Sequence, residues 1–359
     1  MNLNKTYQIL LIALAFLLPL TVFGGNLVIV LICLLWLFSG QYKAKLTKII
    51  NNKLMIASII FFIAHVVGLL WSEDLSWGIH IVHKMWYFIG LLPILFTIVE
   101  KDYISHYITA FLAAISISEI CSYLVWLEFI EPFKYATVLN PTPFMSHISY
   151  NPILAFAIYL VLHKILFDKR ITRLVLYFYS FFAITMTINM FITGGRAGQI
   201  MYFGMLCIIS FQFFNTQKIK ALLLIVVLIP AICFTAYSTS DLFQQRVDAA
   251  IENTINYSDK KYTPVGQRIS YAINSWELIK KNPIIGVGTG DFPAEHAKIN
   301  EKNSPSIPFT TNPHNMFALI TVQLGVIGLV SMLSIFYQQF KLSFDISNQF
   351  MRNTGVTLP

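Results

Sequence analysis

Long uncharged apolar runs, separated by short polar segments, are the main pattern along this chain. A run of roughly 17–25 apolar residues is long enough to cross a bilayer as a helix. The first run lacks a small-residue cleavage site and a second run follows at once, so we interpret it as a retained helix rather than a signal peptide. Ten spans are predicted, at about residues 7–23, 25–39, 54–71, 85–99, 107–128, 152–166, 174–193, 198–214, 221–238 and 314–339. The predicted fold is an all-α integral membrane protein, a polytopic bundle of about ten transmembrane helices with one large extramembrane loop.

The composition supports this class. Of the 359 residues, 56% are hydrophobic and only 12% are charged, whereas charged residues make up about 25% of an average soluble domain. So few charges could not keep the surface of a soluble enzyme in solution, and soluble enzymes and disordered chains are therefore largely excluded. The net charge of +8 is better explained by basic cytoplasmic loops than by a nucleic-acid partner.

The positions of Lys and Arg orient the predicted spans. Basic residues collect in cytoplasmic loops of membrane proteins, and here they alternate between the two faces when the N-terminus is placed inside. The short outside segments then carry only Lys84, Lys134 and Arg196. The inside segments carry Lys5, Lys43, Lys45, Lys48, Lys53, Lys101, Lys169, Arg170, Arg173, Lys218, Lys220, Lys341 and Arg352. A cytoplasmic N-terminus is therefore predicted.

This topology divides the chain into four segments: nine helices in 1–238, a large outer loop in 239–313, the tenth helix in 314–340 and a polar cytoplasmic tail in 341–359. The loop contains one amphipathic stretch, RISYAINSWELIKK at 268–281, with Ile269, Ile273, Trp276 and Ile279 on one side. Such a helix is expected either to lie at the membrane surface or to cap the bundle.

Three residues assigned to the outer face have the chemistry of a phosphate site. Arg196 lies in Thr-Gly-Gly-Arg-Ala-Gly between two spans, Arg268 opens the amphipathic stretch, and His314 begins the last span. Arg binds phosphate oxygens in a bidentate way, and His can accept a hydroxyl proton near neutral pH. The glycines around Arg196 are expected to permit unusual backbone angles and the close approach of an anion. The alternative for Arg196 is that it only reaches to outer headgroups. Together the three residues predict a site for a lipid-linked phosphate or diphosphate.

Other candidates are weaker. Lys84 is expected to add charge near a diphosphate, and His147 is a candidate substrate contact at the outer end of a span. The segment Ile-Gly-Val-Gly-Thr-Gly-Asp at 285–291 has the wrong spacing and context for a nucleotide loop. Glu119, a buried acid in the fifth span, is expected either to pair with another span or to line a conduit. No metal site is predicted, because the cysteines lie inside apolar runs and neither His80 nor His83 has an evident third ligand nearby.

Several motifs together resemble the O-antigen ligase and polymerase superfamily. His314-Asn315, nine residues and then Gly325-x-x-Gly328 is similar to the His-Asn-x9-Gly-x-x-Gly signature of that superfamily. Gly195-Arg196-Ala197-Gly198 matches its outer-face Arg position, and Arg268 followed by 283–292 matches its large periplasmic loop. The resemblance covers the organisation of most of the chain and is sharpest from 190 to 330.

The resemblance implies a function. It implies an inverting, metal-independent glycosyltransferase of the bacterial inner membrane, without a cofactor, that acts at the periplasmic face. The donor would be a glycan on undecaprenyl diphosphate, and for a ligase the acceptor would be a lipid A-core hydroxyl. Arg196 and Arg268 would hold the donor diphosphate, and His314 would activate or position the acceptor hydroxyl. An O-antigen polymerase and a protein O-oligosaccharyltransferase use the same donor and remain alternatives.

Two further expectations follow. A transporter or flippase would carry charges near the midplane and broken helices, whereas the distinctive charges here collect at one face, so an enzyme is favoured. Superfamily members usually carry about two more spans after the long loop. We therefore expect either a short member of the superfamily or a truncated sequence.

Overall fold

The computed structural model describes residues 3–358, and the ends of the predicted segments, residues 1–2 and 359, lie outside the described residues. All the elements described in this range are helices, with one isolated bridge between Thr137 and Asn140. Seven helices are long and apolar enough to cross a membrane, or up to nine if each of two bent pairs is one span. This arrangement confirms the predicted class of an all-α polytopic membrane protein.

The number of spans is smaller than the ten expected. The first predicted span is the helix α1 (Leu3–Leu17), whose 15 residues fall short of a full crossing. The second, α2 (Val22–Phe38), meets α3 (Tyr42–Ile50) at a bend of 115°. The fourth also follows a bend, of 46°, between Leu75–Lys84 and Trp86–Ile98. The apolar runs are where the sequence placed them, but run length alone does not show where a helix bends.

The chain forms two compact units. The first comprises the residues up to Ser39, Ile98–Val247 and Ile346–Leu358, and the second comprises Gly40–Thr97 and Asp248–Asp345. The helices of the first unit, beside α1 and α2, are η2 (Lys101–Tyr103), α8 (Ile104–Trp126), α9 (His147–Phe167), α10 (Arg173–Ile192), α11 (Arg196–Phe214), α12 (Lys218–Thr239), the start of α13 (Asp241–Ile255) and α17 (Gln349–Thr357). Those of the second, beside α3, are α4 (Lys53–Val67), η1 (Gly68–Trp71), α5 (Leu75–Lys84), α6 (Trp86–Ile89), most of α7 (Leu91–Ile98), α14 (Pro264–Lys281), α15 (Phe292–Asn303) and α16 (Met316–Phe344).

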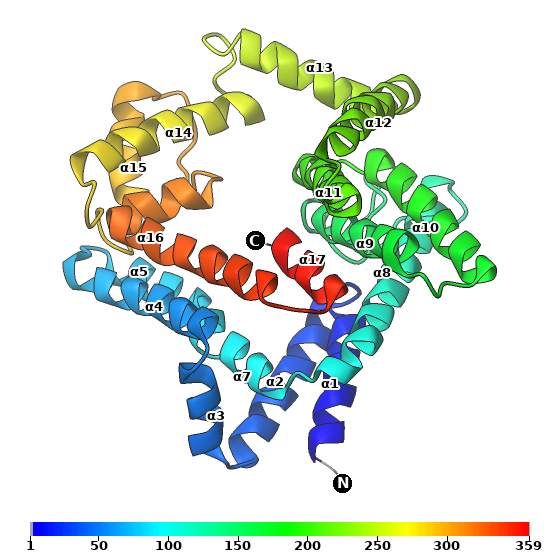
Figure 1. Cartoon of the computed structure of the whole chain (residues 1–359). Helices are drawn as coiled ribbons and strands as arrows, with labels where there is room; N and C mark the ends of the chain where they lie inside the picture. Colours follow the sequence, from blue (N-terminus) through cyan, green and yellow to red (C-terminus); the bar gives the residue numbers. More distant parts are fainter. Residues whose placement is uncertain (1–2, 359) are drawn as a thin grey trace. The chain divides into compact units, whose positions relative to one another are not determined.

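The helix α9 is the centre of the first unit. It packs against α10 and α11 (Figure 1), and its side chains are buried on all sides, among them Tyr150, Leu154, Ile158 and Tyr159. A helix that is apolar all round is stable only when neighbouring helices cover it. The N-terminal end of α9 is His147, so the packing of this helix determines where that predicted site residue lies.

In the second unit α16 packs against α4 and α14. Phe61 of α4 and Ile320 of α16 are buried in the same apolar cluster. Leu278 of α14 and Phe292 of α15 are buried with Leu319 of α16 in another. The large predicted loop is thus not open chain, because α14 and α15 fold onto the start of the last membrane helix.

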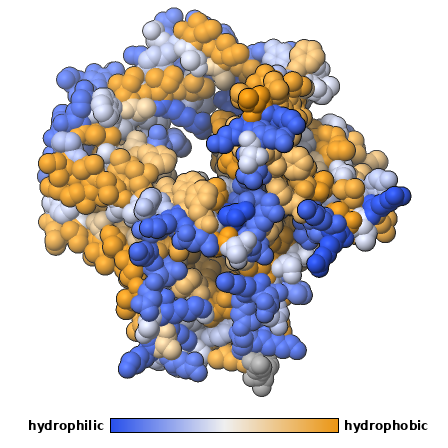
Figure 2. Space-filling view, viewed as in Figure 1, coloured by the Kyte–Doolittle hydropathy of each residue, from blue (hydrophilic) through white to orange (hydrophobic). Residues whose placement is uncertain are grey.

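The exposed surfaces suit a lipid environment. Only 11% of the most apolar stretch of α12 is buried, although its mean hydropathy is 2.6, and its Leu223, Val226 and Phe234 are exposed. Figure 2 shows hydrophobic residues spread over the helical surfaces and hydrophilic residues gathered over α3. Exposing an apolar surface of this extent to water would be strongly unfavourable, so the helices are those of a multi-pass membrane protein.

The predicted polar tail contains the short helix α17, which packs onto the first unit. The Asn353 Nδ2 lies 3.1 Å from the His163 Nε2 of α9. The Gln212 side chain of α11 donates from its Nε2 to the Asn353 carbonyl and to the Thr357 Oγ1, each over 3.1 Å. These hydrogen bonds hold the polar residues of the tail against the helical core.

Candidate functional site

The Gly-Gly-Arg-Ala-Gly segment of the first unit is packed tightly against α9. A Cβ at Gly195 would stand 2.5 Å from the His147 carbonyl oxygen, and one at Gly198 would stand 2.6 Å from the Pro152 nitrogen. None of the three glycines here has a positive φ. The expectation of unusual backbone angles was therefore wrong, and glycine is required because no side chain fits between α11 and α9.

Buried hydrogen bonds hold the turn that precedes Arg196. The Thr193 hydroxyl donates to the Asn151 Oδ1 over 2.9 Å, and the Gln199 Nε2 donates to the Thr193 carbonyl over 3.3 Å. The Gly194 N–H donates to the Asn140 Oδ1 over 3.1 Å. These bonds place Arg196 at the first residue of α11, where it is half-buried and no side chain caps the helix.

This packing leads to a stability prediction for α11. We expect Gly198→Ala to lower the midpoint temperature of thermal unfolding in detergent, because forcing extra atoms into a packed interface costs about 1–3 kcal/mol. Gly204→Ala in the same helix is the matched control, since a Cβ there meets nothing within 4 Å. The control is expected to be neutral or slightly stabilising, because Ala has the higher helix propensity. Equal midpoints for the two variants would contradict the proposed tight contact.

A second arginine, Arg246, lies beside the same turn. Its Nη2 is 2.8 Å and its Cζ 3.0 Å from the point where a Cβ of Gly194 would stand. Arg246 also lies near enough to the His147 imidazole to act on it electrostatically. Arg246 was not among the residues predicted from the sequence, because one arginine in a polar loop gives no signal without its neighbours. The first unit thus brings together His147, Arg196 and Arg246 around Gly194 and Gly195.

His314 has an unusual backbone in the second unit. Its φ is +58°, in the left-handed region that few residues other than glycine adopt. The Asn312 Oδ1 accepts from the His314 N–H over 2.7 Å, and the Asn315 side chain caps α16 by accepting from the Ala318 N–H over 3.2 Å. The imidazole is exposed, with its ring centroid 6.2 Å from that of Tyr271. Two asparagine side chains therefore restrain the backbone on both sides of an accessible imidazole at the start of α16.

A second histidine of this unit, His296, is buried where His314 is exposed. His296 of α15 is fully buried, stacks on Phe292 with ring centroids 5.2 Å apart and meets the edge of Tyr271 at 5.5 Å. Burial lowers the pKa of His296 to about 4, because the charged form loses its hydration. His296 is therefore a neutral core residue at neutral pH, whereas His314 is available to a substrate.

Arg268 lies in α14 and is exposed. The buried face of α14 is mostly polar, with Ser270 and Asn274 among its residues, whereas the apolar Ile273 and Trp276 are 51% and 60% exposed. Ile279, from the same predicted apolar face, packs against the cluster formed with α15 and α16, and the two expectations for this helix stay open.

Gly325, one of the two signature glycines, lies at a break inside α16. Gly325 has φ +61° and ψ −158° inside this helix. The segment 283–288 crosses the break: the Val326 N–H donates to the Pro283 carbonyl over 2.8 Å, and the Val287 N–H donates to the Val322 carbonyl over 2.9 Å. In a membrane, the backbone groups freed by such a break must find partners within the protein. The glycine-rich segment supplies them, which gives it a structural role in place of the nucleotide loop that its spacing already argued against.

The remaining candidates lie elsewhere in their units. Lys84 is exposed at the end of α5 in the second unit, and Glu119 is 1% exposed within α8 of the first. Within residues 3–358, no group of three or more His, Cys, Asp or Glu side chains could hold a metal ion. The prediction that Arg196, Arg268 and His314 serve one substrate involves both units and stays a prediction.

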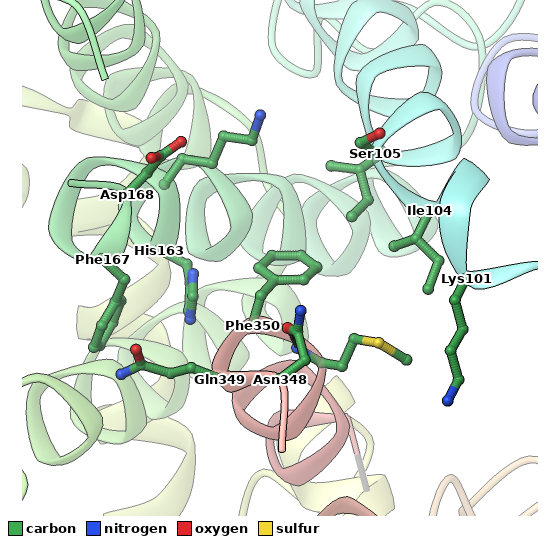
Figure 3. A pocket seen from close by; sticks show the side chains of 12 residues that line it. Lys101, Ile104, Ser105, His163, Phe167, Asp168, Asn348, Gln349 and Phe350 are labelled. Carbon is green, nitrogen blue, oxygen red and sulfur yellow. Dashed lines mark hydrogen bonds between the residues drawn. The ribbon is translucent and has the colours of Figure 1, made fainter. Parts of the chain in front are cut away.

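The first unit also contains a pocket of about 450 Å³ at the other end of α9 from His147. Figure 3 shows the Phe350 ring of α17 in the middle of this pocket, with His163 and Phe167 on one side and Lys101 and Ile104 on the other. It contains none of the predicted site residues.

Comparison with known proteins agrees with the class of protein that the fold indicates. The fold and its apolar surfaces define a multi-pass membrane protein. Residues 181–333 match the family model described as O-antigen ligase, and this match confirms the predicted resemblance to the O-antigen ligase-like superfamily. The family suggests a glycosyltransferase-like enzyme activity with a lipid-linked glycan and a lipid acceptor. A search of curated proteins finds no match.

Proposed function

We propose that this protein is an O-antigen ligase. It transfers a glycan from undecaprenyl diphosphate to a lipid A-core hydroxyl at the periplasmic face of the bacterial inner membrane, and its N-terminus lies in the cytoplasm. The observation that carries the proposal is the family match, because the matched range 181–333 contains Arg196, Arg268 and His314 together. The two signature glycines, Gly325 and Gly328, lie in the same range.

The chemistry needs few protein groups. The bond between the anomeric carbon and the diphosphate oxygen breaks, and its electron pair leaves with the diphosphate. The acceptor oxygen bonds to the same carbon from the opposite side, so the configuration inverts, and the acceptor proton passes to the His314 imidazole. Arg196 and Arg268 balance the charge that develops on the leaving diphosphate. A diphosphate stabilised in this way is a good leaving group, so the proposal assigns no role to a metal or a cofactor.

The local structure around His314 supports its proposed role. General base catalysis requires an imidazole that the acceptor can reach, held in a defined orientation. His314 is exposed, and the hydrogen bond to Asn312 and the cap by Asn315 restrain the backbone on both of its sides. A left-handed backbone at a residue other than glycine is a conformation that proteins often keep at functional positions.

A deletion strain tests the proposal, with lipopolysaccharide separated on a gel and the lipid-linked glycan quantified alongside. We expect every O-chain band to disappear, including the core that bears a single repeat unit, while full-length glycan accumulates on its carrier. Survival of the core with one unit would contradict the proposal and point to a polymerase. An unchanged gel would also contradict it and would direct the search to glycoproteins of the periplasm.

A further inference from the structure

The position of Arg246 is determined by contacts at the start of α13. The Ser240 hydroxyl donates to the Phe191 carbonyl at the end of α10 over 2.9 Å, and the Phe243 N–H donates to the Ser240 Oγ over 3.2 Å. The Phe191 and Phe243 rings meet edge to face at 5.1 Å. Because α10 leads directly into the glycine turn, these contacts tie the first turns of α13 to that turn.

The guanidinium of Arg246 packs on the main chain of this turn. A Cβ at Gly194 would come within 2.8 Å of the Arg246 Nη2, so only glycine lets the guanidinium approach so closely. The Gly194 N–H donates to the Asn140 Oδ1 over 3.1 Å, which also restrains the turn. Gly195 and Gly198 pack against α9, whereas Gly194 allows a planar cation to lie against the backbone.

The charges at this position suit an anion. Arg246 is half-buried, and it forms no ion pair with any other residue between 3 and 358. The imidazole of His147 is one of its electrostatic neighbours. A partly desolvated guanidinium next to a second basic group is costly on its own and becomes favourable when an anion binds both.

We infer that Arg246, His147 and the Gly194–Gly195 turn form a phosphate-binding site in the first unit, with Arg246 binding two phosphate oxygens through its fork. The phosphate is that of the lipid-linked donor, and this part of the inference rests on the proposed function. Arg246 thereby joins Arg196 as a second donor-binding arginine of the first unit.

Binding of two lipids by the full chain in nanodiscs tests the inference. The probes are undecaprenyl diphosphate and neutral undecaprenol, and native mass spectrometry measures the affinity of the wild type, Arg246→Gln, Arg246→Lys and Arg170→Gln. Arg170 is the matched control, because it is exposed in the loop before α10 and outside the site. We expect Arg246→Gln to weaken diphosphate binding at least about tenfold and to leave undecaprenol binding unchanged. Arg246→Lys, which keeps the charge and loses the fork, is expected to lie between Arg246→Gln and the wild type.

The remaining outcomes overturn the inference in distinguishable ways. If Arg246→Gln binds undecaprenyl diphosphate as well as the wild type and Arg170→Gln do, the Arg246 site is wrong while the proposed function stands. If Arg246→Gln weakens the binding of both lipids equally, Arg246 has a structural role and the inference fails. A wild type with no preference for the diphosphate over undecaprenol would contradict both this inference and the proposed donor.

Discussion

Replacing His314 by asparagine is expected to lower the rate of glycan transfer about 10²–10⁴-fold, the usual contribution of a general base, without loss of folded protein. Asparagine is the informative replacement because it tolerates the left-handed backbone of this position, where φ is +58°. It therefore removes the imidazole and keeps the start of α16. The rate of transfer from purified undecaprenyl-diphosphate glycan to lipid A-core is measured in nanodiscs. The midpoint temperature of thermal unfolding is measured for the same variants.

Two further variants separate chemistry from structure. His314→Gly also accepts the backbone angle and leaves space at the imidazole position, so added imidazole is expected to restore part of its activity. The exposed His106 in the predicted cytoplasmic part of α8 provides a control, and His106→Asn is expected to retain full activity. Full transfer by His314→Asn would eliminate the base role, and full transfer by His314→Gly without added imidazole would eliminate both the base and the positioning role.

Replacing Arg196 by alanine is expected to reduce kcat/KM for the donor about 100-fold, in the range seen when one charge-stabilising donor is removed from an active site. The loss is expected partly in donor affinity, because the guanidinium would hold the diphosphate before and during the reaction. Arg196→Lys keeps the charge but cannot bind two oxygens in one plane, so it is expected to recover only part of the activity. Donor titrations of the initial transfer rate measure both effects.

The control for Arg196 is Arg173→Ala. Arg173 is the exposed first residue of α10, at the predicted cytoplasmic face, and its loss is expected to leave transfer unchanged. Unchanged donor affinity in Arg196→Ala would remove the diphosphate role of Arg196 and favour the alternative in which this side chain only reaches to lipid headgroups.

Much of the helical framework could be predicted from the sequence. The apolar runs lie in helices, and α16 begins at Met316, two residues after the expected start of the tenth span at His314. The spacing of His314, Gly325 and Gly328 indicated the superfamily that the match of 181–333 confirms. These features are local, because span length and motif spacing depend on consecutive residues.

Other features could not be predicted because they depend on packing between distant segments. The break at Gly325 depends on hydrogen bonds to a distant segment, among them the one that the Pro283 carbonyl accepts from the Val326 N–H. The amphipathic pattern of 268–281 suggested an apolar face, but not that the unit would bury the opposite, polar face of α14. The angles of the bends after α2 and α5, 115° and 46°, likewise cannot be read from the hydropathy of their runs.

The sequence by itself determined the class of protein, the predicted orientation and the motif that links the chain to O-antigen ligases, because hydrophobic length and charge placement act along the chain. Only the tertiary structure decided which residues surround the glycine turn. Asn140, His147 and Arg246 reach Gly194 and Gly195 from three separate segments, up to 54 residues away. The sequence marked only His147 as a candidate, and no local pattern marks Asn140 or Arg246, because only the packing of α9, α10 and α13 brings these residues to one turn.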